Sequence, residues 1–482
     1  MISIRPVANT IGKLVVTLGV AMALPMIVDY WHGSDNWVAF FEAGTLCVVL
    51  GLLIATATRA EDKSLNLQQA FLLTTGLWVV LPLFGALPFM IGAPNVPFTD
   101  AYFEAMSGLS TTGTTVFPHL DELPQGTHLW RGLLQWLGGL GIIVVAMIFL
   151  PVMKVGGMQF FKSEGFDTLG KILPRAFDIA AETTLVYIAL TMTAALTFLA
   201  LGMNGFDAFF HAMTTSSTGG FSNHDASFAE YPGAPQFAAS FFTVLAALPF
   251  IRMVQLLRGD PEPMWRDIQI RAFLRWISYA ITVIVLYRLL WLGAESPLDV
   301  IRETVFNVVT LTAGAGFGTA DLTQWGHFPF TVLIIMGMIG GCTGSTACSI
   351  KVFRYLVLFE AIKAQIRRMH SPHRVFPLRL EGRPLEREVV TSVMAFFTTF
   401  IIAMGLLIVG LSLCGLHPLT ALTGGWAMIA NIGPVWGPEV SSNGAVDQFS
   451  GMAKWLMIVG MLMGRLELLS VLVLFLPRFW RQ

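Results

Sequence analysis

The stretch FTDAYFEAMSGLSTTGTTV, residues 98–116, decides the fold because a diverged copy of it, GFDAFFHAMTTSSTGGFS, stands at residues 205–222. Both copies hold an acidic residue, then aromatic residues, then Ala-Met, and finally hydroxyl residues that end in glycine. Two weaker copies follow, RETVFNVVTLTAGAGFGTAD at 302–321 and LTALTGGWAMIANIGP at 419–434. Four copies of one element between long apolar segments predict a ring around an axis.

The same spacing separates a polar residue from a glycine in all four copies, in the pairs Asp100 and Gly113, Asp207 and Gly220, Glu303 and Gly316, and Thr420 and Gly433. We expect the first residue of each pair to cap a short helix at its positive end. About ten helical residues rise roughly 15 Å, which is half of the hydrocarbon core, so each helix ends at mid-membrane. A glycine turn there directs carbonyl oxygens toward the axis, where they replace the water of a dehydrated cation. A single such glycine is typical of an ordinary loop turn, whereas four at equal spacing favour a pore element.

The composition is that of a membrane protein. Hydrophobic residues make up 55% of the 482 residues and charged residues only 12%, against about 25% charged in a soluble domain. The net charge of −1 argues against nucleic acid as a partner, because phosphate binding needs a basic excess. The four cysteines form no CxxC pair and the histidines have no ligand spacing, so neither a disulfide framework nor a metal centre is indicated.

Ten segments are apolar enough to cross a bilayer, which takes about 20 residues each. They span 9–29, 37–58, 69–92, 130–150, 182–202, 236–256, 271–292, 329–350, 388–412 and 451–476. Lysine and arginine gather in alternate connections, at 58–68, 151–181, 257–270 and 351–387, whereas the other connections hold only Arg302. Since positive loops stay inside, we expect both termini to be cytoplasmic and the four glycine elements to face outward. A secretion signal at the first segment is the less favoured alternative.

Acidic residues in the outward connections can concentrate cations at the mouth of such a ring. They are Asp121, Glu122, Asp225, Glu230, Asp321, Glu439 and Asp447. Each of them singly is more typical of a solvated loop charge.

Two intramembrane features lie outside the repeated elements. The run GMIGGCTGSTACSIK at 337–351 is rich in glycine, which disfavours a regular helix, and we expect a break there on the cytoplasmic side of the ring. Close helix packing through small residues is the alternative. Arg465 lies inside the last apolar segment, where a charge needs a cavity or a partner, although it can also snorkel to the interface. Lys351 and Arg354 open the most basic loop, where topological anchoring is favoured over a direct role in gating.

These motifs resemble the Trk/Ktr/HKT potassium transporters, specifically the bacterial TrkH type. The resemblance is carried by SGLSTTGTTV at 107–116, TGGFSNHDAS at 218–227, GFGTAD at 316–321, NIGP at 431–434, GGCTGSTACSIK at 340–351 and GRLELLSVLVLF at 464–475. It implies an all-α polytopic membrane protein with four helix/pore-loop/helix repeats around a central pore plus two N-terminal helices. The implied boundaries are 1–65 for the two extra helices and 66–165, 166–260, 261–387 and 388–482 for repeats 1 to 4.

The resemblance also implies the residues of a potassium filter, which are Thr111, Thr112, Gly113, Gly219, Gly220, Ala315, Gly316, Ile432 and Gly433. It implies an intramembrane gating loop below them, with Gly344, Ser345, Thr346, Lys351 and Arg465 as gating residues. Glycine in all four loops is typical of potassium-preferring members, and one glycine turn per loop predicts moderate selectivity over sodium. The usual glycine run after Ser-Thr is replaced here by Ala347-Cys348-Ser349, which puts the mobility of the loop in question.

Partners and location follow from the same resemblance. It implies K⁺ as the transported ion, held only at the filter positions, no cofactor and no catalytic residue. It further implies a homodimer in the bacterial inner membrane and a cytosolic nucleotide-binding TrkA-type subunit, for which the amphipathic stretch 354–369 is a candidate contact. Channel-like and ion-coupled transport both stay open. The alternatives are an intramembrane enzyme, for which Ser345 and Cys348 lack an evident base, and a non-conducting membrane scaffold.

Overall fold

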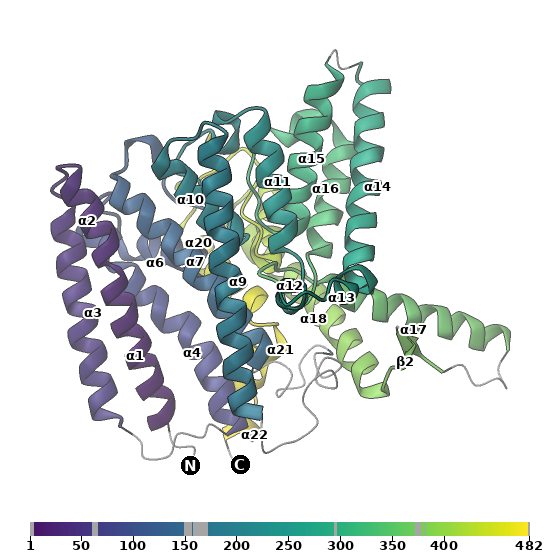
Figure 1. Ribbon diagram of the computed structural model, residues 1–482, viewed down its shortest axis with the longest axis horizontal. Coiled ribbons are helices and arrows are strands. Elements are labelled where there is room, and N and C mark those ends of the chain that lie inside the picture. Colours follow the sequence, from purple (N-terminus) through teal and green to yellow (C-terminus); the bar gives the residue numbers. More distant parts are fainter. Residues whose placement is uncertain are drawn as a thin grey trace.

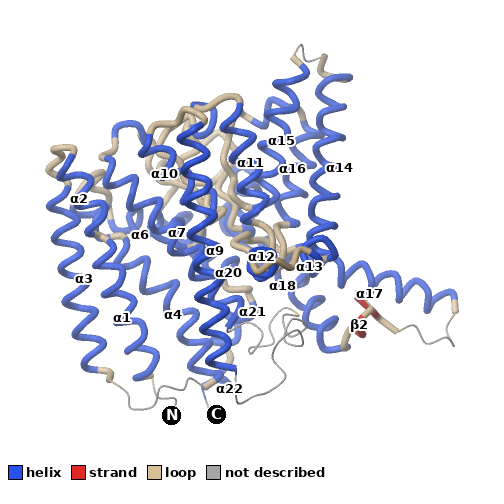
Figure 2. Tube along the Cα trace, in the orientation of Figure 1, coloured by secondary structure: helices blue, strands red, loops and turns tan. Residues whose placement is uncertain are grey.

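The chain folds into a bundle of long helices that is suited to a bilayer. The computed structural model describes residues 4–59, 66–148, 157, 172–293, 296–371, 377–380 and 382–480. Among these residues, seven helices are long and apolar enough to cross a membrane, and two further spans are helix pairs bent at a short break. A tenth apolar segment is the shorter helix α16, His327–Ile339. Figures 1 and 2 show the helices side by side, which confirms the all-α polytopic class.

The elements follow the order expected for four repeats. Four short helices stand between spans, namely α6 (Phe98–Leu109), α10 (Gly205–Ser216), α15 (Pro297–Ala313) and α19 (Pro418–Ala430). The spans before them are α4 (Leu67–Gly85) with α5 (Leu87–Ile91), α9 (Ile172–Ala200), α14 (Ile268–Leu290) and α18 (Arg387–Leu413). The spans after them are α7 (Gln125–Ile148), α11 (Ala234–Ala246) with α12 (Phe250–Leu257), α16, and α20 (Gly451–Arg465) with α21 (Leu469–Leu472).

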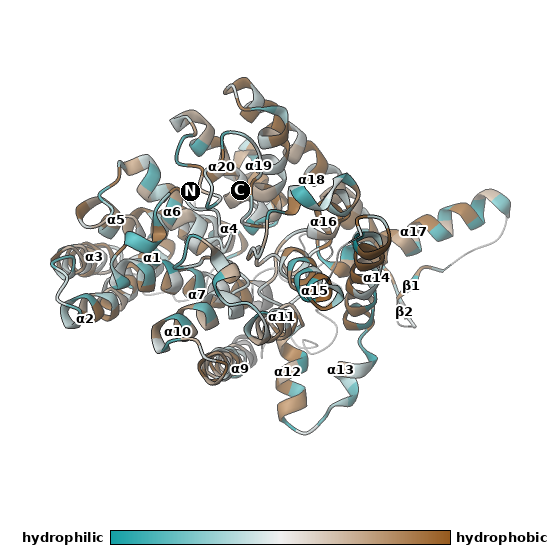
Figure 3. Ribbon diagram, turned by 90° about the horizontal axis from the view of Figure 1, so that it is seen from above, coloured by the Kyte–Doolittle hydropathy of each residue, from teal (hydrophilic) through white to brown (hydrophobic). Residues whose placement is uncertain are grey.

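Contacts between these helices close into a ring. The helix after each loop packs against the short helix of its own repeat and against that of the next repeat. Thus α7 contacts α6 and α10, α11 contacts α10 and α15, α16 contacts α15 and α19, and α20 contacts α19 and α6. Seen from above, the elements surround one axis (Figure 3). The last repeat therefore joins the first, as a pore around one axis requires.

Two N-terminal spans lie outside this ring. They are α1 (Arg5–Ala21), continued by α2 (Ala23–Trp31), and α3 (Trp37–Ala57). α1 packs on α3 and α4, while α2 packs on α3 and α7. The buried carboxylate of Asp29 accepts hydrogen bonds from the Gly126 N–H at 2.6 Å and from Asn36 at 2.7 Å, and this ties the extra helices to the first repeat.

Two of the connections between repeats form small elements of their own. They are α13 (Glu262–Arg266), α17 (Val352–His370) and the antiparallel strands β1 (Arg379–Leu380) and β2 (Arg383–Pro384), with Arg379 opposite Pro384. The chain ends with α22 (Pro477–Trp480). In Figure 1, α17 projects sideways from the half of the molecule that also holds both chain ends.

The residues predicted to cap the four short helices are wrong as caps. Asp100 lies in the first turn of α6, and Asn204 rather than Asp207 caps α10 by accepting the Asp207 N–H. α15 begins at Pro297, so that Glu303 lies in its interior and the helix has 17 residues, about 25 Å. His417 rather than Thr420 accepts the first free N–H group of α19. Three of these helices begin at or directly after a proline, namely Pro97, Pro297 and Pro418. Because proline favours the first helical position, each helix begins before the residue predicted to cap it.

Three predicted spans are also not continuous helices. The span at 236–256 breaks before Pro249 with a bend of 97°, and the span at 451–476 breaks after Arg465 with a bend of 106°. In the span predicted at 329–350, the helix ends at Ile339, because Gly340 has a φ of +75°. Hydrogen bonds join the three breaks, since Thr346 donates to the Ala246 carbonyl and Arg465 donates to the Thr346 carbonyl.

Candidate functional site

One ring of backbone contacts joins the four glycines that the sequence predicts to turn the loops, Gly113, Gly220, Gly316 and Gly433. A Cβ atom added to Gly113 would lie 2.1 Å from the carbonyl oxygen of Gly219, and one added to Gly220 would lie 1.6 Å from that of Ala315. A Cβ on Gly316 would lie 3.0 Å from the nitrogen of Gly433, and one on Gly433 would lie 2.9 Å from the carbonyl carbon of Gly113. Each loop thus touches the next and the fourth touches the first, so the structure brings all four together.

The loops share an alternating backbone conformation. Left-handed φ values occur at the glycine and two residues before it, at Thr111 and Gly113, Thr218 and Gly220, and Gly314 and Gly316. In the fourth loop Asn431, with φ +51°, takes the first of these positions, while Gly433 has no positive φ. Gly433 is therefore required for close approach to its neighbour and not for its own φ, which differs from the prediction.

The short helices end in the same way in three loops. The residue before the glycine donates its N–H to the carbonyl five residues back at 2.9 Å, in the pairs Thr112–Ser107, Gly219–Thr214 and Ile432–Ala427. In the third loop Gly316 itself donates, to the Thr310 carbonyl at 3.0 Å. The carbonyl ends of helices carry partial negative charge, so the convergence of four such ends favours a cation.

Two carbonyls predicted to face the ion are hydrogen-bonded to neighbouring side chains. Gln135 donates to the Gly219 carbonyl at 2.6 Å, and Thr114 donates to the Gly433 carbonyl at 2.6 Å. A carbonyl oxygen has two lone pairs, so each can still accept a second interaction. These side chains hold the loops in register from outside the ring.

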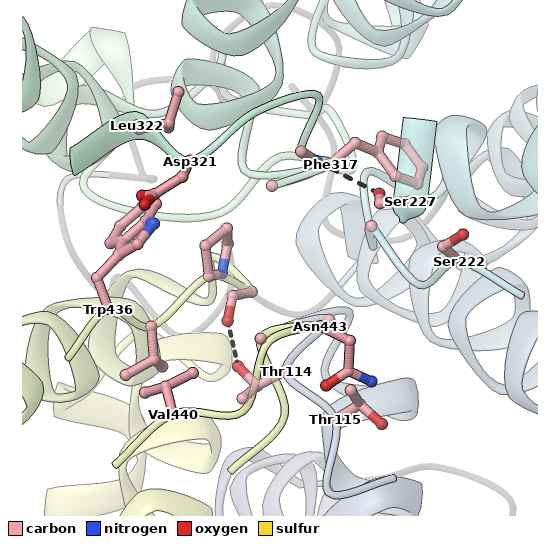
Figure 4. A pocket seen from close by; sticks show the side chains of 18 of the residues that line it. Thr114, Thr115, Ser222, Ser227, Phe317, Asp321, Leu322, Trp436, Val440 and Asn443 are labelled. Carbon is pink, nitrogen blue, oxygen red and sulfur yellow. Dashed lines mark hydrogen bonds between the residues drawn. The ribbon is translucent and has the colours of Figure 1, made fainter. Parts of the chain in front are cut away.

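A cavity of about 640 Å³ opens above the four glycines. Residues from all four loops line it, including Thr114, Ser222, Phe317 and Trp436 (Figure 4). Because the four glycines themselves form part of its lining, the cavity leads directly to the ring.

Two of the predicted mouth acids, Asp225 and Asp321, line the cavity. Both also hold loop backbone, since Asp225 accepts the Leu120 N–H at 2.9 Å and Asp321 accepts the Thr323 N–H at 3.0 Å. Asp121 pairs with His224 at 2.9 Å, and Glu439 accepts the His417 N–H at 2.8 Å. Among the described residues, no group of three His, Cys, Asp or Glu side chains is arranged to hold a metal ion.

The break after α16 lies directly below the ring. Residues 340–351 form no regular helix, and Gly340, Gly344, Ser349 and Lys351 all have positive φ. Thr346 donates its hydroxyl to the Ala246 carbonyl at 3.0 Å, and the Phe250 N–H donates to the Gly344 carbonyl at 3.0 Å. The break in α16 is thus held by the break between α11 and α12.

Cys348 places this segment under the filter loops. Its sulfur lies 3.8 Å from the hydroxyl oxygen of Thr111 in the first loop. A Cβ added to Gly314 in the third loop would lie 3.6 Å from the Cys348 nitrogen. The hydroxyl of Thr346, two residues earlier, also lies 3.2 Å from the Ser216 carbonyl at the end of α10. The segment therefore lies against three of the four loops, beneath the ring.

Arg465 joins this segment to the rest of the protein. It donates to the Thr346 carbonyl at 3.4 Å, to the Cys348 sulfur and to the Gly138 carbonyl at 3.2 Å. Its side chain is only 3% exposed, so it does not snorkel to the interface. The predicted neighbourhood of Arg465 and the interrupted segment is present in the structure.

Lys351 and Arg354, for which the sequence favours topological anchoring, are both buried, and Arg354 forms an ion pair with Glu467. Its guanidinium also lies 3.8 Å from the centre of the Phe396 ring. The sharp break after Arg465 turns Glu467 toward α17, a placement that a continuous helix would not give. Ser345, by contrast, bonds within the segment, to the Cys342 carbonyl at 2.6 Å.

Three polar residues of the first repeat support the loops but are not among the predicted site residues. They are Glu104 on α6 and Arg131 and Gln135 on α7, all fully buried. Arg131 and Gln135 are four residues apart, so they share one face of the helix. Polar and charged residues inside apolar segments are the signal that points to them, since such residues are rare in a membrane unless functional.

The fold and the site define a polytopic membrane protein in which four loops converge on one ring and an interrupted helix lies beneath them. A family model described as TrkH, cation transport protein, matches residues 37–482. The chain belongs to this family, and it is accordingly a transport protein and not an enzyme.

Its relatives extend over the full chain. It is 37% identical over 480 residues to the Trk system potassium uptake protein TrkI of Halomonas elongata, covering 99% of this chain and 97% of that protein. It is 34% identical over 490 residues to the Trk system potassium uptake protein TrkH of Escherichia coli, covering 99% of each. The crystal structure of the potassium transporter TrkH from Vibrio parahaemolyticus superposes with a TM-score of 0.92 at 32% identity, covering 100% of both chains.

Proposed function

We propose that this chain is the potassium-translocating pore subunit of a bacterial uptake system. The ring of four glycine contacts carries the proposal, because it brings backbone oxygens of four loops to one axis in an otherwise apolar protein. The printed names of the relatives, potassium uptake proteins, support K⁺ as the ion.

In this proposal the filter consists of backbone carbonyls that replace the hydration shell of K⁺. The oxygens come from Thr111, Thr112, Gly113, Gly219, Gly220, Ala315, Gly316, Ile432 and Gly433. The cavity above them, with Asp225 and Asp321 in its lining, raises the local cation concentration at the outer mouth. Selectivity over Na⁺ is moderate, because each loop supplies one short turn and not a long run of carbonyls.

Residues 340–351 act as the gate in this proposal. The contact of Cys348 with Thr111 supports this role, since an ion leaving the ring meets this segment first. Arg465 holds the segment closed, while Gly344, Ser345 and Thr346 form the part that moves. Lys351 lies at its end, buried next to α17, and transmits a movement of α17 to the gate.

We further propose that the protein is a homodimer in the bacterial inner membrane, with both termini in the cytoplasm. A cytosolic TrkA-type nucleotide-binding subunit binds α17, whose last turn carries Arg367, Arg368 and His370. This choice is supported by the sequence order, because α17 begins directly after Lys351, the last residue of the gate. A partner that binds α17 can therefore move Lys351. The termini and α17 share one side of the molecule (Figure 1).

Substitution of a filter glycine tests the proposed function. We expect Gly113→Ser to abolish K⁺-dependent growth of an uptake-deficient bacterium at low K⁺, because the new Cβ meets the Gly219 carbonyl at 2.1 Å and the residue needs φ +89°. Gly405→Ser on α18 is the control, since a Cβ at Gly405 meets nothing within 4 Å. The amount of each protein in the membrane is measured in parallel.

Equal growth with both variants, at equal protein levels, would show that the ring is not the conduction path. Failure of the wild-type chain to support growth, together with no rubidium flux in vesicles that contain the purified protein and its regulatory subunit, would favour the scaffold alternative.

A further inference from the structure

One position of the short helices carries a polar side chain that reaches the segment after the glycine. It lies four residues after the repeated acidic residue, at Glu104, His211 and Asn307. Glu104 accepts the Val116 N–H at 2.9 Å, and Asn307 donates to the Thr319 hydroxyl at 2.6 Å. This position therefore braces each loop against its own helix.

The second and fourth loops use related contacts. His211 lies 3.3 Å from the Ser222 hydroxyl through Nε2. In the fourth repeat the position is Gly424, and the neighbouring Thr423 donates to the Trp436 carbonyl at 2.8 Å and accepts the Trp436 N–H at 3.1 Å. Of these four bracing side chains, only Glu104 is a carboxylate.

Glu104 forms a buried ion pair with Arg131 of α7. The Arg131 Nε and a Glu104 oxygen are 2.7 Å apart, and both side chains are 0% exposed. Thr115 completes the pair, since its hydroxyl donates to Glu104 at 2.9 Å and accepts from Arg131 at 3.3 Å. A buried ion pair is retained only where such additional hydrogen bonds satisfy both charges.

Arg131 extends this brace from the first loop to the second. Its Nη1 donates to the Ser222 carbonyl at 2.7 Å, and its guanidinium lies 4.2 Å from the centre of the Phe221 ring. One turn further along α7, Gln135 donates to the Gly219 carbonyl at 2.6 Å and accepts the Phe221 N–H at 3.1 Å. One face of α7 therefore contacts Gly219, Phe221 and Ser222 of the second loop, while Glu104 contacts the first loop.

We propose that the Glu104–Arg131 pair determines ion selectivity by fixing the separation of the first and second filter loops. The inference rests on the proposed function. Discrimination between K⁺ and the smaller Na⁺ depends on the spacing and number of the coordinating carbonyls. The pair acts on that spacing directly, because it connects segments two or three residues beyond Gly113 and Gly220 without touching the ion. Glu104 and Arg131 are thus positioning residues.

The experiment measures K⁺ and Na⁺ flux into vesicles that contain the full-length protein with its regulatory subunit. We expect Glu104→Gln to lower the K⁺/Na⁺ flux ratio at least about tenfold, because it leaves Arg131 buried with no ionised partner. Asp100→Asn is the matched control, since Asp100 lies one turn earlier on the same helix. Its carboxylate pairs with Lys454 at a distance of 2.7 Å and, within the described part of the chain, does not contact the second loop. Its flux ratio should equal that of the wild type.

A milder variant keeps the test decisive if Glu104→Gln fails to accumulate. Thr115→Val keeps the shape and both charges but removes the hydroxyl between them, and we expect a fall in the ratio of at least about threefold, the effect of one ordinary hydrogen bond. A lower total flux at an unchanged ratio would overturn the inference, because a merely structural role predicts that result. If Gly113→Ser abolishes transport while the Glu104 and Thr115 variants keep the wild-type ratio, only this inference fails and the proposed function stands.

Discussion

Replacement of Arg465 by alanine should open the path in the absence of any activating partner. Arg465 makes two contacts with the segment beneath the ring, to the Thr346 carbonyl and the Cys348 sulfur, and one with the Gly138 carbonyl of α7. The first two hold the segment below the ring. The third contact, with the Gly138 carbonyl, holds the Arg465 side chain in place, because Gly138 lies inside the continuous helix α7.

The size of the effect follows from these contacts. A hydrogen bond to a charged group contributes about 1.5–3 kcal/mol. One contact is long, at 3.4 Å, and the other is to sulfur, a weak acceptor, so we take a total of about 2–3 kcal/mol for the closed state. This corresponds to a roughly 30- to 150-fold shift of the equilibrium toward an open segment.

The assay is ⁸⁶Rb⁺ uptake into vesicles that contain the purified protein without its regulatory subunit. We expect Arg465→Ala to raise the initial rate at least about tenfold, because part of the shift is lost if the open state is not fully conducting. Arg258→Ala is the control, since Arg258 is an exposed arginine that pairs with Glu182. Uptake at the wild-type rate by correctly inserted Arg465→Ala protein would refute the assignment of Arg465 to the gate.

Two further predictions concern the outer loop and the thiol. Hydrogen bonds from His224 to Asp207 and Asp121 raise the pKa of its imidazole from 6.5 to about 9, so its stabilising effect is complete below pH 6.5 and is lost as the pH rises through about 9. The melting temperature of the wild type should exceed that of His224→Gln at pH 6 and match it above the higher pKa, and a constant difference would contradict this. Cys348→Gly removes the side chain next to Thr111 and adds backbone freedom of ~0.5–1 kcal/mol, so rubidium uptake without the regulatory subunit should rise about two- to fivefold. Cys348→Ser should stay near the wild-type rate, and equal rates in all three proteins would exclude a closing role for the thiol.

Much of the fold is predictable from the sequence because its causes are local. Ten apolar segments, the glycine spacing of the four loops and the interruption after Ile339 can all be read from neighbouring residues. The convergence of the loops is predictable as well, since four copies of one element pack most simply around an axis. The residues at which the short helices begin are not predictable in this way, because proline and asparagine can start a helix as well as acidic residues can.

The candidate site divides in the same manner. The nine proposed filter positions and the segment 340–351 follow from the family resemblance and its motifs, whereas the burial of Lys351 and Arg354 does not. A basic residue at the end of an apolar segment looks the same in sequence whether it meets water or a carboxylate. Glu467 becomes the partner of Arg354 only because the chain bends by 106° after Arg465.

The sequence by itself determined that this protein crosses a membrane with four re-entrant loops, because hydropathy and glycine spacing are properties of short stretches. Only the tertiary structure decided which groups meet at the axis, such as Cys348 below Thr111 and Arg131 between the first two loops. The physical reason is that a buried polar group in a lipid environment must find its partner wherever the packing brings one. Those partners lie tens to hundreds of residues away along the chain, at a distance that no local pattern encodes.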